Sequence, residues 1–349
     1  MAHEARELLI HLGFNKTGSS YLQTIVANSL DAMEAQGVMY PRPANIVQAA
    51  KGNATTGNVI QFEELLADHA LLDQIAQPKV LYSSEMIFLA LQDPKKRELF
   101  ADLFRDPRIG KVKILLFVRD PSGHASSVYQ QNVKGGGMVA TVDSFYLNQY
   151  SSPRQVCVAL EFLETFPNVT VELHNYTVVK SRIFDIFADW CGLPREAFTM
   201  PTVKTVNRSL TSAELMLQMR LNERLGASGR NLTRLLVSRL PHIRPDDIRP
   251  SVAVQQALWE RLRANLDFID ARLPEAERFD PTRDIVEPEN SLEHAVFSRE
   301  QIEVIGDCIA EAILLSRGEN PAVLYKPAAK PAKPAKPARP NAEKPRTET

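Results

Sequence analysis

A short segment near the N-terminus contains the residue types that bind an anion. It reads Gly13-Phe14-Asn15-Lys16-Thr17-Gly18-Ser19-Ser20, after an apolar run at 8–12 and before a helical pattern that begins at Ser19. In such a strand-to-helix turn the backbone N–H groups converge at the helix N-terminus, where the dipole favours negative charge. Lys16 adds a full positive charge, and the hydroxyl side chains add hydrogen-bond donors. The segment therefore predicts a site for a phosphate or sulfate group.

The same segment differs from the loop that binds nucleoside triphosphates. Gly13 and Gly18 have the G-x4-G spacing of that loop, but Ser19 stands where its motif requires lysine. The GK[ST] tripeptide that organises a triphosphate and Mg²⁺ is therefore missing. A second interpretation of the segment is a plain glycine-containing turn with an incidental lysine.

Another candidate anion site follows the apolar run at 113–118. Arg119-Asp120-Pro121 comes directly after this run, and Ser127 lies eight residues beyond Arg119 on a predicted helix. An arginine at a strand end can make a bidentate contact with a phosphate, and the chain can return through the proline turn to bring a serine hydroxyl beside it. The alternative is an arginine at a sheet edge and an ordinary helix serine.

Together the two segments resemble the cofactor-binding motifs of the PAPS-dependent sulfotransferase family. That family has a 5′-phosphosulfate loop, PKSGTT-like and matched here by residues 15–22, and an arginine and a serine eight residues apart that bind a 3′-phosphate. The strings at 10–23 and 119–131 are most similar to bacterial carbohydrate-type sulfotransferases. The resemblance is specific over 7–25 and 112–134, agrees in order and spacing to about 210, and is weak beyond. It departs at Asn15, where relatives often carry another polar residue or proline, and at His124, where arginine is frequent.

The resemblance implies a donor and a set of donor-binding residues. The donor is 3′-phosphoadenosine 5′-phosphosulfate (PAPS), a co-substrate, and no metal ion is expected. Sulfuryl transfer moves an electron-poor group in line between two oxygens, so positioning and charge stabilisation carry the catalysis. Lys16 is implied as the catalytic residue that neutralises the bridging oxygen as adenosine bisphosphate leaves. The implied donor-binding residues are Asn15, Lys16, Thr17, Gly18, Ser19, Ser20, Arg119 and Ser127.

The acceptor must lose a proton, and in this family the base comes from near the end of the second sheet strand. Here the predicted strand at 80–83 leads through Ser84 to Glu85, which is our first candidate for the catalytic base. The alternative for Glu85 is a helix-cap carboxylate. His11 is the second candidate for the base, although its position inside an apolar run also suits a packing role.

Further polar residues are weaker candidates. His124, Tyr129, Gln131 and Lys134 follow the second motif and fit either the acceptor side or an ordinary helix surface. The tripeptide Asn207-Arg208-Ser209 precedes a capping-box pattern and is a candidate for a late phosphate contact. The acceptor stays open: a hydroxyl or amine of a carbohydrate, a glycolipid or a small metabolite.

The hydrophobic periodicity predicts an α/β fold: a P-loop-type parallel sheet flanked by helices, with a helical C-terminal portion. Ligands of such sheets bind at the carboxyl ends of the strands, where both motifs lie. Extended segments are predicted at 8–12, 38–41, 80–83, 113–118 and 169–173, with a loop at 44–60. Helices are predicted at 19–36, 61–76, 126–133, 154–166, 179–191, 211–224, 229–239, 251–273 and 298–316.

Composition narrows the class of protein. The chain has 349 residues, of which 44% are hydrophobic and 24% charged, which excludes a wholly disordered or collagen-like chain. No apolar stretch reaches the length of a membrane span, so none is expected. Three widely spaced cysteines argue for a reducing compartment and against structural zinc, so we expect a cytoplasmic protein.

The last residues differ in composition from the rest. Residues 326–349 are rich in Lys, Pro and Ala and carry a net charge of +5, so the net charge of −1 for the chain leaves −6 for the remainder. We expect one domain at 1–325 and a disordered tail at 326–349, which either solubilises the protein or attracts an acidic partner. The acidic body does not suggest a nucleic-acid-binding protein.

Three functions from different classes follow. The first is a sulfotransferase that uses PAPS, and the second is a P-loop kinase or nucleotide hydrolase that uses ATP and Mg²⁺. The missing GK[ST] tripeptide counts against the second. The third is an inactive nucleotide-binding scaffold on the same fold, which sulfate transfer to an acceptor would exclude.

Overall fold

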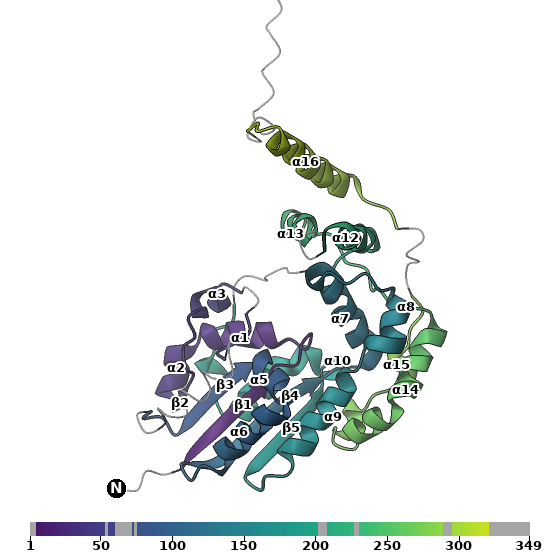
Figure 1. The fold of residues 1–349 in the computed structure, drawn as a ribbon. Helices are drawn as coiled ribbons and strands as arrows, with labels where there is room; N and C mark the ends of the chain where they lie inside the picture. Colours follow the sequence, from purple (N-terminus) through teal and green to yellow (C-terminus); the bar gives the residue numbers. More distant parts are fainter. Residues whose placement is uncertain are drawn as a thin grey trace, which may run out of the picture. The chain divides into compact units, whose positions relative to one another are not determined.

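The computed structural model describes residues 5–52, 55–59, 72, 75–201, 208–226, 230–288 and 295–320. The chain divides into two units, Met1–Ser298 and Arg299–Thr349, and the first contains the sheet (Figure 1). The predicted tail at 326–349 and most of the predicted helix at 61–76 lie outside the described residues.

A five-stranded parallel sheet organises the first unit, which confirms the predicted α/β class. Its strands follow the order β2-β3-β1-β4-β5, and each neighbouring pair is parallel. Leu12 at the end of β1 is in register with Ser84 of β3 and Leu116 of β4. The carboxyl ends therefore meet at one edge, where residues from three strands can share a ligand. The strands are β1 (Arg6–Leu12), β2 (Val38–Met39), β3 (Lys79–Ser84), β4 (Ile109–Val118) and β5 (Val169–Asn175).

Successive residues of β1 face opposite sides of the sheet, as the strand period requires. Leu8, Ile10 and Leu12 pack in one hydrophobic cluster, with side chains of α5 (Glu85–Ala90), α6 (Pro94–Arg105) and α9 (Ser152–Leu163). Leu9 packs in the other cluster, with side chains of α1 (Ser19–Ala27) and α11 (Ile183–Cys191). Burial on both faces explains the continuous apolar runs of the central strands.

Several predicted boundaries were wrong. The predicted helix at 19–36 is two helices, α1 and α2 (Leu30–Ala35), because the Ser29 hydroxyl donates to the Ile25 carbonyl at 2.6 Å and terminates the first. The predicted loop at 44–60 contains α3 (Ile46–Ala50). The predicted strand at 113–118 begins at Ile109.

The helix predicted at 126–133 is longer at both ends. It is α7 (Pro121–Gly136), which begins where the Asp120 carboxylate accepts from the Gly123 N–H and proline takes the first helical position. It ends at Gly137, whose φ of 75° is left-handed. This earlier start matters because it places Ser127 in the second turn, close to the end of β4.

The remaining helices follow in chain order. The predicted helix at 179–191 is divided into α10, a 3₁₀ turn at 180–182 and α11. The elements not yet given are α8 (Val142–Ser144), a π-helix (Phe145–Gln149), α10 (Tyr176–Val179), α12 (Ser212–Leu225), α13 (Arg230–Arg239), α14 (Val252–Asp270), α15 (Pro281–Asp284), two 3₁₀ turns (Arg195–Ala197 and Glu275–Glu277) and, in the second unit, α16 (Arg299–Ser316).

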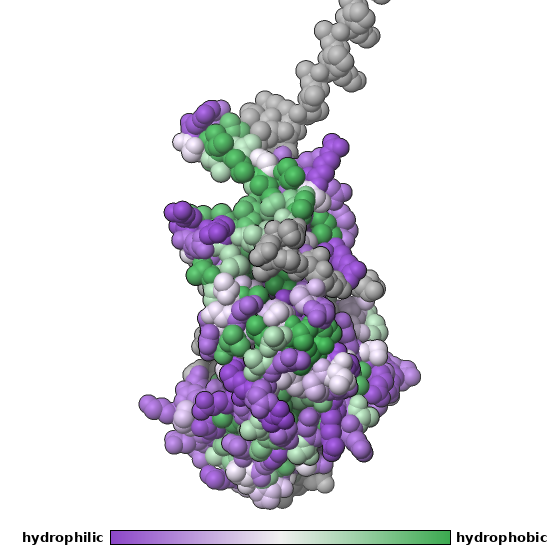
Figure 2. Space-filling view, turned by 90° about the vertical axis from the view of Figure 1, so that its right-hand side faces the viewer, coloured by the Kyte–Doolittle hydropathy of each residue, from purple (hydrophilic) through white to green (hydrophobic). Residues whose placement is uncertain are grey.

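Hydrophilic side chains cover much of the face that Figure 2 presents, with apolar side chains scattered among them. Within the ranges described, no helix has the length and apolar character needed to cross a membrane.

Candidate functional site

The loop between β1 and α1 has the backbone shape of an anion cradle. Lys16 has a φ of 62° and Gly18 a φ of 86°, both left-handed. This conformation costs a non-glycine residue about 1–2 kcal/mol, so its surroundings must hold Lys16 in place. Alternation of right- and left-handed residues turns successive N–H groups toward one point. No side chain caps the N-terminus of α1, and its first turn has no acidic residue. The end of the helix is therefore electropositive.

Two hydroxyl groups of this loop bind the loop itself. Thr17 Oγ1 donates to the Phe14 carbonyl at 2.5 Å, and Ser19 Oγ donates to the same oxygen at 3.3 Å. Thr17 is fully buried. The Thr17 hydroxyl therefore faces the loop interior, whereas Ser20 is among the residues that line the cleft.

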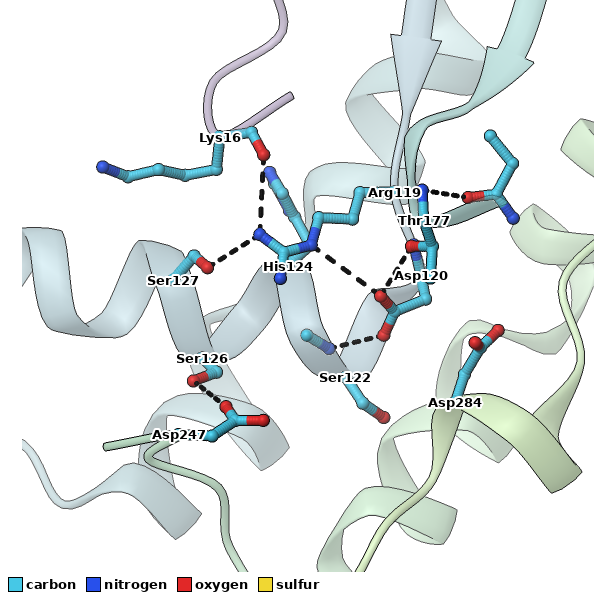
Figure 3. A network of polar contacts seen from close by, with 12 residues as sticks. Lys16, Arg119, Asp120, Ser122, His124, Ser126, Ser127, Thr177, Asp247 and Asp284 are labelled. Carbon is cyan, nitrogen blue, oxygen red and sulfur yellow. Dashed lines mark hydrogen bonds and ion pairs between the residues drawn. The ribbon is translucent and has the colours of Figure 1, made fainter. Parts of the chain in front are cut away.

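The two sequence motifs meet at Arg119. Its Nη1 donates to Ser127 Oγ at 2.9 Å, which confirms the expected proximity of the two side chains. The same nitrogen donates to the Lys16 carbonyl at 3.5 Å, while the Lys16 side chain points away from the guanidinium (Figure 3). One arginine thus joins the end of β4, the second turn of α7 and the β1–α1 loop.

The Asp120 carboxylate contacts the Arg119 guanidinium and is itself held by two hydrogen-bond donors. The carboxylate lies 3.8 Å from Arg119 Nε and accepts from the Gly123 N–H at 2.5 Å and the Thr177 hydroxyl at 2.8 Å (Figure 3). Burial raises the pKa of Asp120, while the Gly123 N–H and the Arg119 charge lower it. A Cβ at Gly123 would lie 2.8 Å from the Asp120 carboxylate, so a larger residue there would displace this carboxylate.

Glu85 comes from the end of the neighbouring strand β3. The N-cap of α5 is Ser84, whose hydroxyl accepts from the Met86 N–H at 3.0 Å, so the helix-cap role considered for Glu85 belongs to Ser84. Gly13 packs against Glu85: a Cβ at Gly13 would lie 3.1 Å from Glu85 Cγ. The close approach brings this carboxylate beside the loop that carries Lys16.

The β1–α1 loop, Glu85 and Ser127 line a cleft of about 880 Å³. This volume lies toward the upper end of the range for small-molecule sites, about 300–1,000 Å³. Thr17, which is fully buried, and Arg119, whose side chain is 25% exposed, are not among the residues that line it, whereas the other predicted donor-binding residues and Glu85 are. Leu210 and Val237 are the apolar side chains among its described lining residues. These are Asn15, Lys16, Gly18, Ser19, Ser20, Thr55, Thr56, Glu85, Ser127, Gln130, Gln131, Lys134, Gly135, Arg208, Ser209, Leu210, Arg234, Val237 and Ser238.

Three further candidates are buried and are not among the residues that line the cleft. His11 is fully buried, its Nδ1 lies 2.8 Å from Ser83 Oγ, and burial lowers its pKa to about 4. His124 is also fully buried, and Tyr129 donates its hydroxyl to the Ala140 carbonyl at 2.9 Å. The suggested acceptor-side position of His124 and Tyr129 was therefore wrong, whereas Gln131 and Lys134 do line the cleft.

The late basic residue Arg208 is occupied by protein partners. Its guanidinium forms a two-point ion pair with Glu214, at 2.7 Å for both nitrogens, and Nε donates to the Leu240 carbonyl at 2.8 Å. This geometry opposes the expected phosphate contact from Arg208; Asn207 lies outside the described residues.

Burial lowers the pKa of Lys134 to about 8, helped by the charges of Lys16 and Arg208.

Part of the cleft wall was missed from the sequence. Gln130 lies three residues after Ser127 on α7, and helical spacing could have identified it. Arg234 and Ser238 come from α13, and Thr55 and Thr56 from the segment before β3. No local pattern marks these four residues, since only the fold brings them to the cleft.

Within the ranges described, no group of three or more His, Cys, Asp or Glu side chains is placed to hold a metal ion. Comparison of the chain with models of protein families and with curated proteins finds no match.

Proposed function

We propose that this chain is a PAPS-dependent sulfotransferase, built on a P-loop-type α/β fold with a helical C-terminal portion and acting in the cytoplasm. The observation that carries the proposal is the 2.9 Å contact between Arg119 and Ser127, with the Lys16 carbonyl 3.5 Å from the same guanidinium. Two motifs about a hundred residues apart, each resembling half of a PAPS site, thus meet at the edge of one cleft.

The loop and the arginine suit the two ends of the donor. Backbone N–H groups at 16–20 and the Lys16 ammonium would hold the 5′-phosphosulfate at the N-terminus of α1. Arg119, with the Ser127 hydroxyl beside it, would hold the 3′-phosphate through charge-assisted hydrogen bonds. An arginine placed in this way distinguishes a nucleotide with a 3′-phosphate from ATP.

Lys16 and Glu85 suit the chemical step. Glu85 takes the proton of the acceptor hydroxyl or amine, and the freed electron pair forms a bond to sulfur. The bond from sulfur to the bridging oxygen of the 5′-phosphate breaks, and adenosine 3′,5′-bisphosphate leaves with its electron pair. Lys16 neutralises the charge that develops on that oxygen. Because burial raises the pKa of Glu85, this carboxylate is a stronger base than an exposed one.

The lining of the cleft supports a hydrophilic acceptor. Leu210 and Val237 are the two apolar side chains among its described residues. Apart from two glycines, the other lining residues carry hydroxyl, amide, carboxylate or basic groups that can hydrogen-bond the hydroxyls of a carbohydrate or of the head group of a glycolipid.

Binding and transfer test the proposal separately. Calorimetric titration should show tighter binding of adenosine 3′,5′-bisphosphate than of ATP with Mg²⁺, and a Ser127→Ala variant should reduce this preference. A preference for ATP with Mg²⁺ would instead support the kinase or hydrolase. Labelled donor incubated with a cell extract, followed by mass spectrometry of the product, then identifies the acceptor. Donor binding without transfer to any acceptor would support the inactive scaffold.

A further inference from the structure

The buried side of the β1–α1 loop is held by His124. Its Nε2 lies 2.9 Å from the Asn15 carbonyl oxygen and 3.0 Å from Asn15 Oδ1. Its Nδ1 lies 2.8 Å from the Tyr150 hydroxyl, and its ring stacks on Phe14 at 4.5 Å between centroids. The ring comes from α7, the helix that carries Ser127, so it connects the two motifs a second time.

The partners of His124 determine which nitrogen carries its proton. Burial lowers the pKa of His124 to about 3, so the ring is neutral and has a single N–H donor. Both groups facing Nε2 are acceptors, so Nε2 carries the hydrogen. Nδ1 then accepts from Tyr150, whose hydroxyl stays protonated because burial raises its pKa well above the usual value.

The direction of this hydrogen bond decides where the next N–H points. The Asn15 carbonyl and the Lys16 N–H belong to one trans peptide plane, in which C=O and N–H point in opposite directions. The carbonyl turns inward to a fully buried ring, whereas Lys16 lines the cleft. The Lys16 N–H therefore faces away from His124. The same reasoning applies one residue later, where Arg119 holds the Lys16 carbonyl at 3.5 Å.

We propose that His124 is a positioning residue of the anion-binding loop: its Nε2–H holds the Asn15 carbonyl and thereby turns the Lys16 N–H toward the bound anion. Together with Arg119 it fixes the peptide planes on both sides of Lys16 in the left-handed conformation. The inference rests on the proposed function only in requiring that the loop binds an anion, and it assigns His124 no contact with donor or acceptor.

The test measures the binding of two probes to variants of the full chain. Each probe contacts a different end of the site. Inorganic pyrophosphate reports the loop, and adenosine 3′-monophosphate reports Arg119 and Ser127. His124→Leu should weaken pyrophosphate binding about tenfold or more, because one oriented N–H contact to a charged group is lost. It should weaken binding of adenosine 3′-monophosphate less than about threefold. His11→Leu is the matched control: it removes another fully buried histidine, and pyrophosphate affinity should be retained.

Conservative variants keep the test decisive if His124→Leu does not fold. The glutamine amide nitrogen reaches the position of Nε2, whereas the asparagine nitrogen reaches only that of Nδ1. His124→Gln should therefore stay within about threefold of the parent affinity for pyrophosphate, and His124→Asn should lose about tenfold. Equal affinities for these two variants, or equal losses for both probes, would overturn the positioning role.

Failure of the proposed function gives a different result. In that case the unmodified chain binds pyrophosphate, and the His124 variants lose this binding as expected. Adenosine 3′,5′-bisphosphate then binds no better than ATP with Mg²⁺, and no sulfate is transferred. If the unmodified chain does not bind pyrophosphate at all, the inference itself is overturned.

Discussion

Glu85 and Lys16 line the same cleft, and the charge of each opposes the effect of burial on the pKa of the other. Burial raises the pKa of Glu85 while the Lys16 charge lowers it, and burial lowers the pKa of Lys16 while the Glu85 charge raises it. The Arg119 charge also lowers the pKa of Lys16. The pair therefore places a carboxylate that is a better base than usual in the same cleft as a lysine whose positive charge the carboxylate favours, as the proposed transfer requires.

Glu85→Gln should abolish proton abstraction and preserve the shape of the side chain. Turnover should fall about 10²–10⁴-fold, the usual contribution of a general base, with donor binding close to that of the parent. The acidic limb of the pH–rate profile should disappear with the carboxylate. In the parent this limb should lie above the ordinary carboxyl range, because the pKa of Glu85 is raised. A variant that keeps its turnover and its acidic limb would place the base elsewhere.

Lys16→Ala should affect catalysis more than binding. One charge contact to the leaving oxygen is lost in the transition state, so sulfate transfer should fall about 10²-fold or more. Calorimetry with adenosine 3′,5′-bisphosphate should show a smaller change, since the loop N–H groups remain. Equal turnover in the variant and the parent would remove Lys16 from the mechanism.

Arg119→Ala should weaken donor binding by about 2–5 kcal/mol, because a charge contact to a phosphate is lost from a largely buried position. Adenosine 5′-phosphosulfate lacks the 3′-phosphate, so its affinity should change much less. Arg195→Ala is the control, because Arg195 pairs with Asp185 on the exposed surface. If both donors lose affinity equally, Arg119 does not recognise the 3′-phosphate.

Glu214→Gln should destabilise the fold. It leaves the charge of Arg208 buried without its partner, in a pair whose side chains are 3% and 0% exposed. We expect the free energy of unfolding to fall by about 3–5 kcal/mol in urea titrations. Glu223→Gln on the same helix breaks an exposed pair with Arg220 and should cost less than about 1 kcal/mol. Similar losses in both variants would contradict the assignment.

His174 should make stability depend on pH. Burial lowers its pKa, but hydrogen bonds to Glu172 and Glu277 outweigh burial and raise it above 6.5. Folding therefore favours the protonated ring, and this stabilisation is complete below the unfolded pKa and lost as pH rises through the folded pKa. Urea titrations from pH 5.5 to 8.5 should show a falling difference in unfolding free energy between the parent and His174→Gln. A difference that stays constant over this range would contradict the shift.

The local parts of the site could be predicted from the sequence. The apolar runs of β1, β3 and β4 predict buried parallel strands, and the residues that end them must lie at one edge of the sheet. The spacing of Arg119 and Ser127 allows their contact, because a chain that returns through a proline turn can bring the serine beside the strand end. The catalytic roles expected of Lys16 and Glu85 came from the resemblance to the sulfotransferase motifs.

Tertiary structure alone decided which groups several polar side chains bind. Thr17 binds its own loop, Arg208 pairs with Glu214, and His124 turns inward to Asn15, 109 residues away in the chain. The sequence alone does not show whether a polar side chain faces solvent, a ligand or a buried carbonyl. Its role is decided by which groups the fold leaves to be hydrogen-bonded, since a buried polar atom without a partner is costly. The local pattern thus predicts which residues lie at the ends of the strands. Which hydrogen bonds the side chains around them form is decided only by how the chain packs.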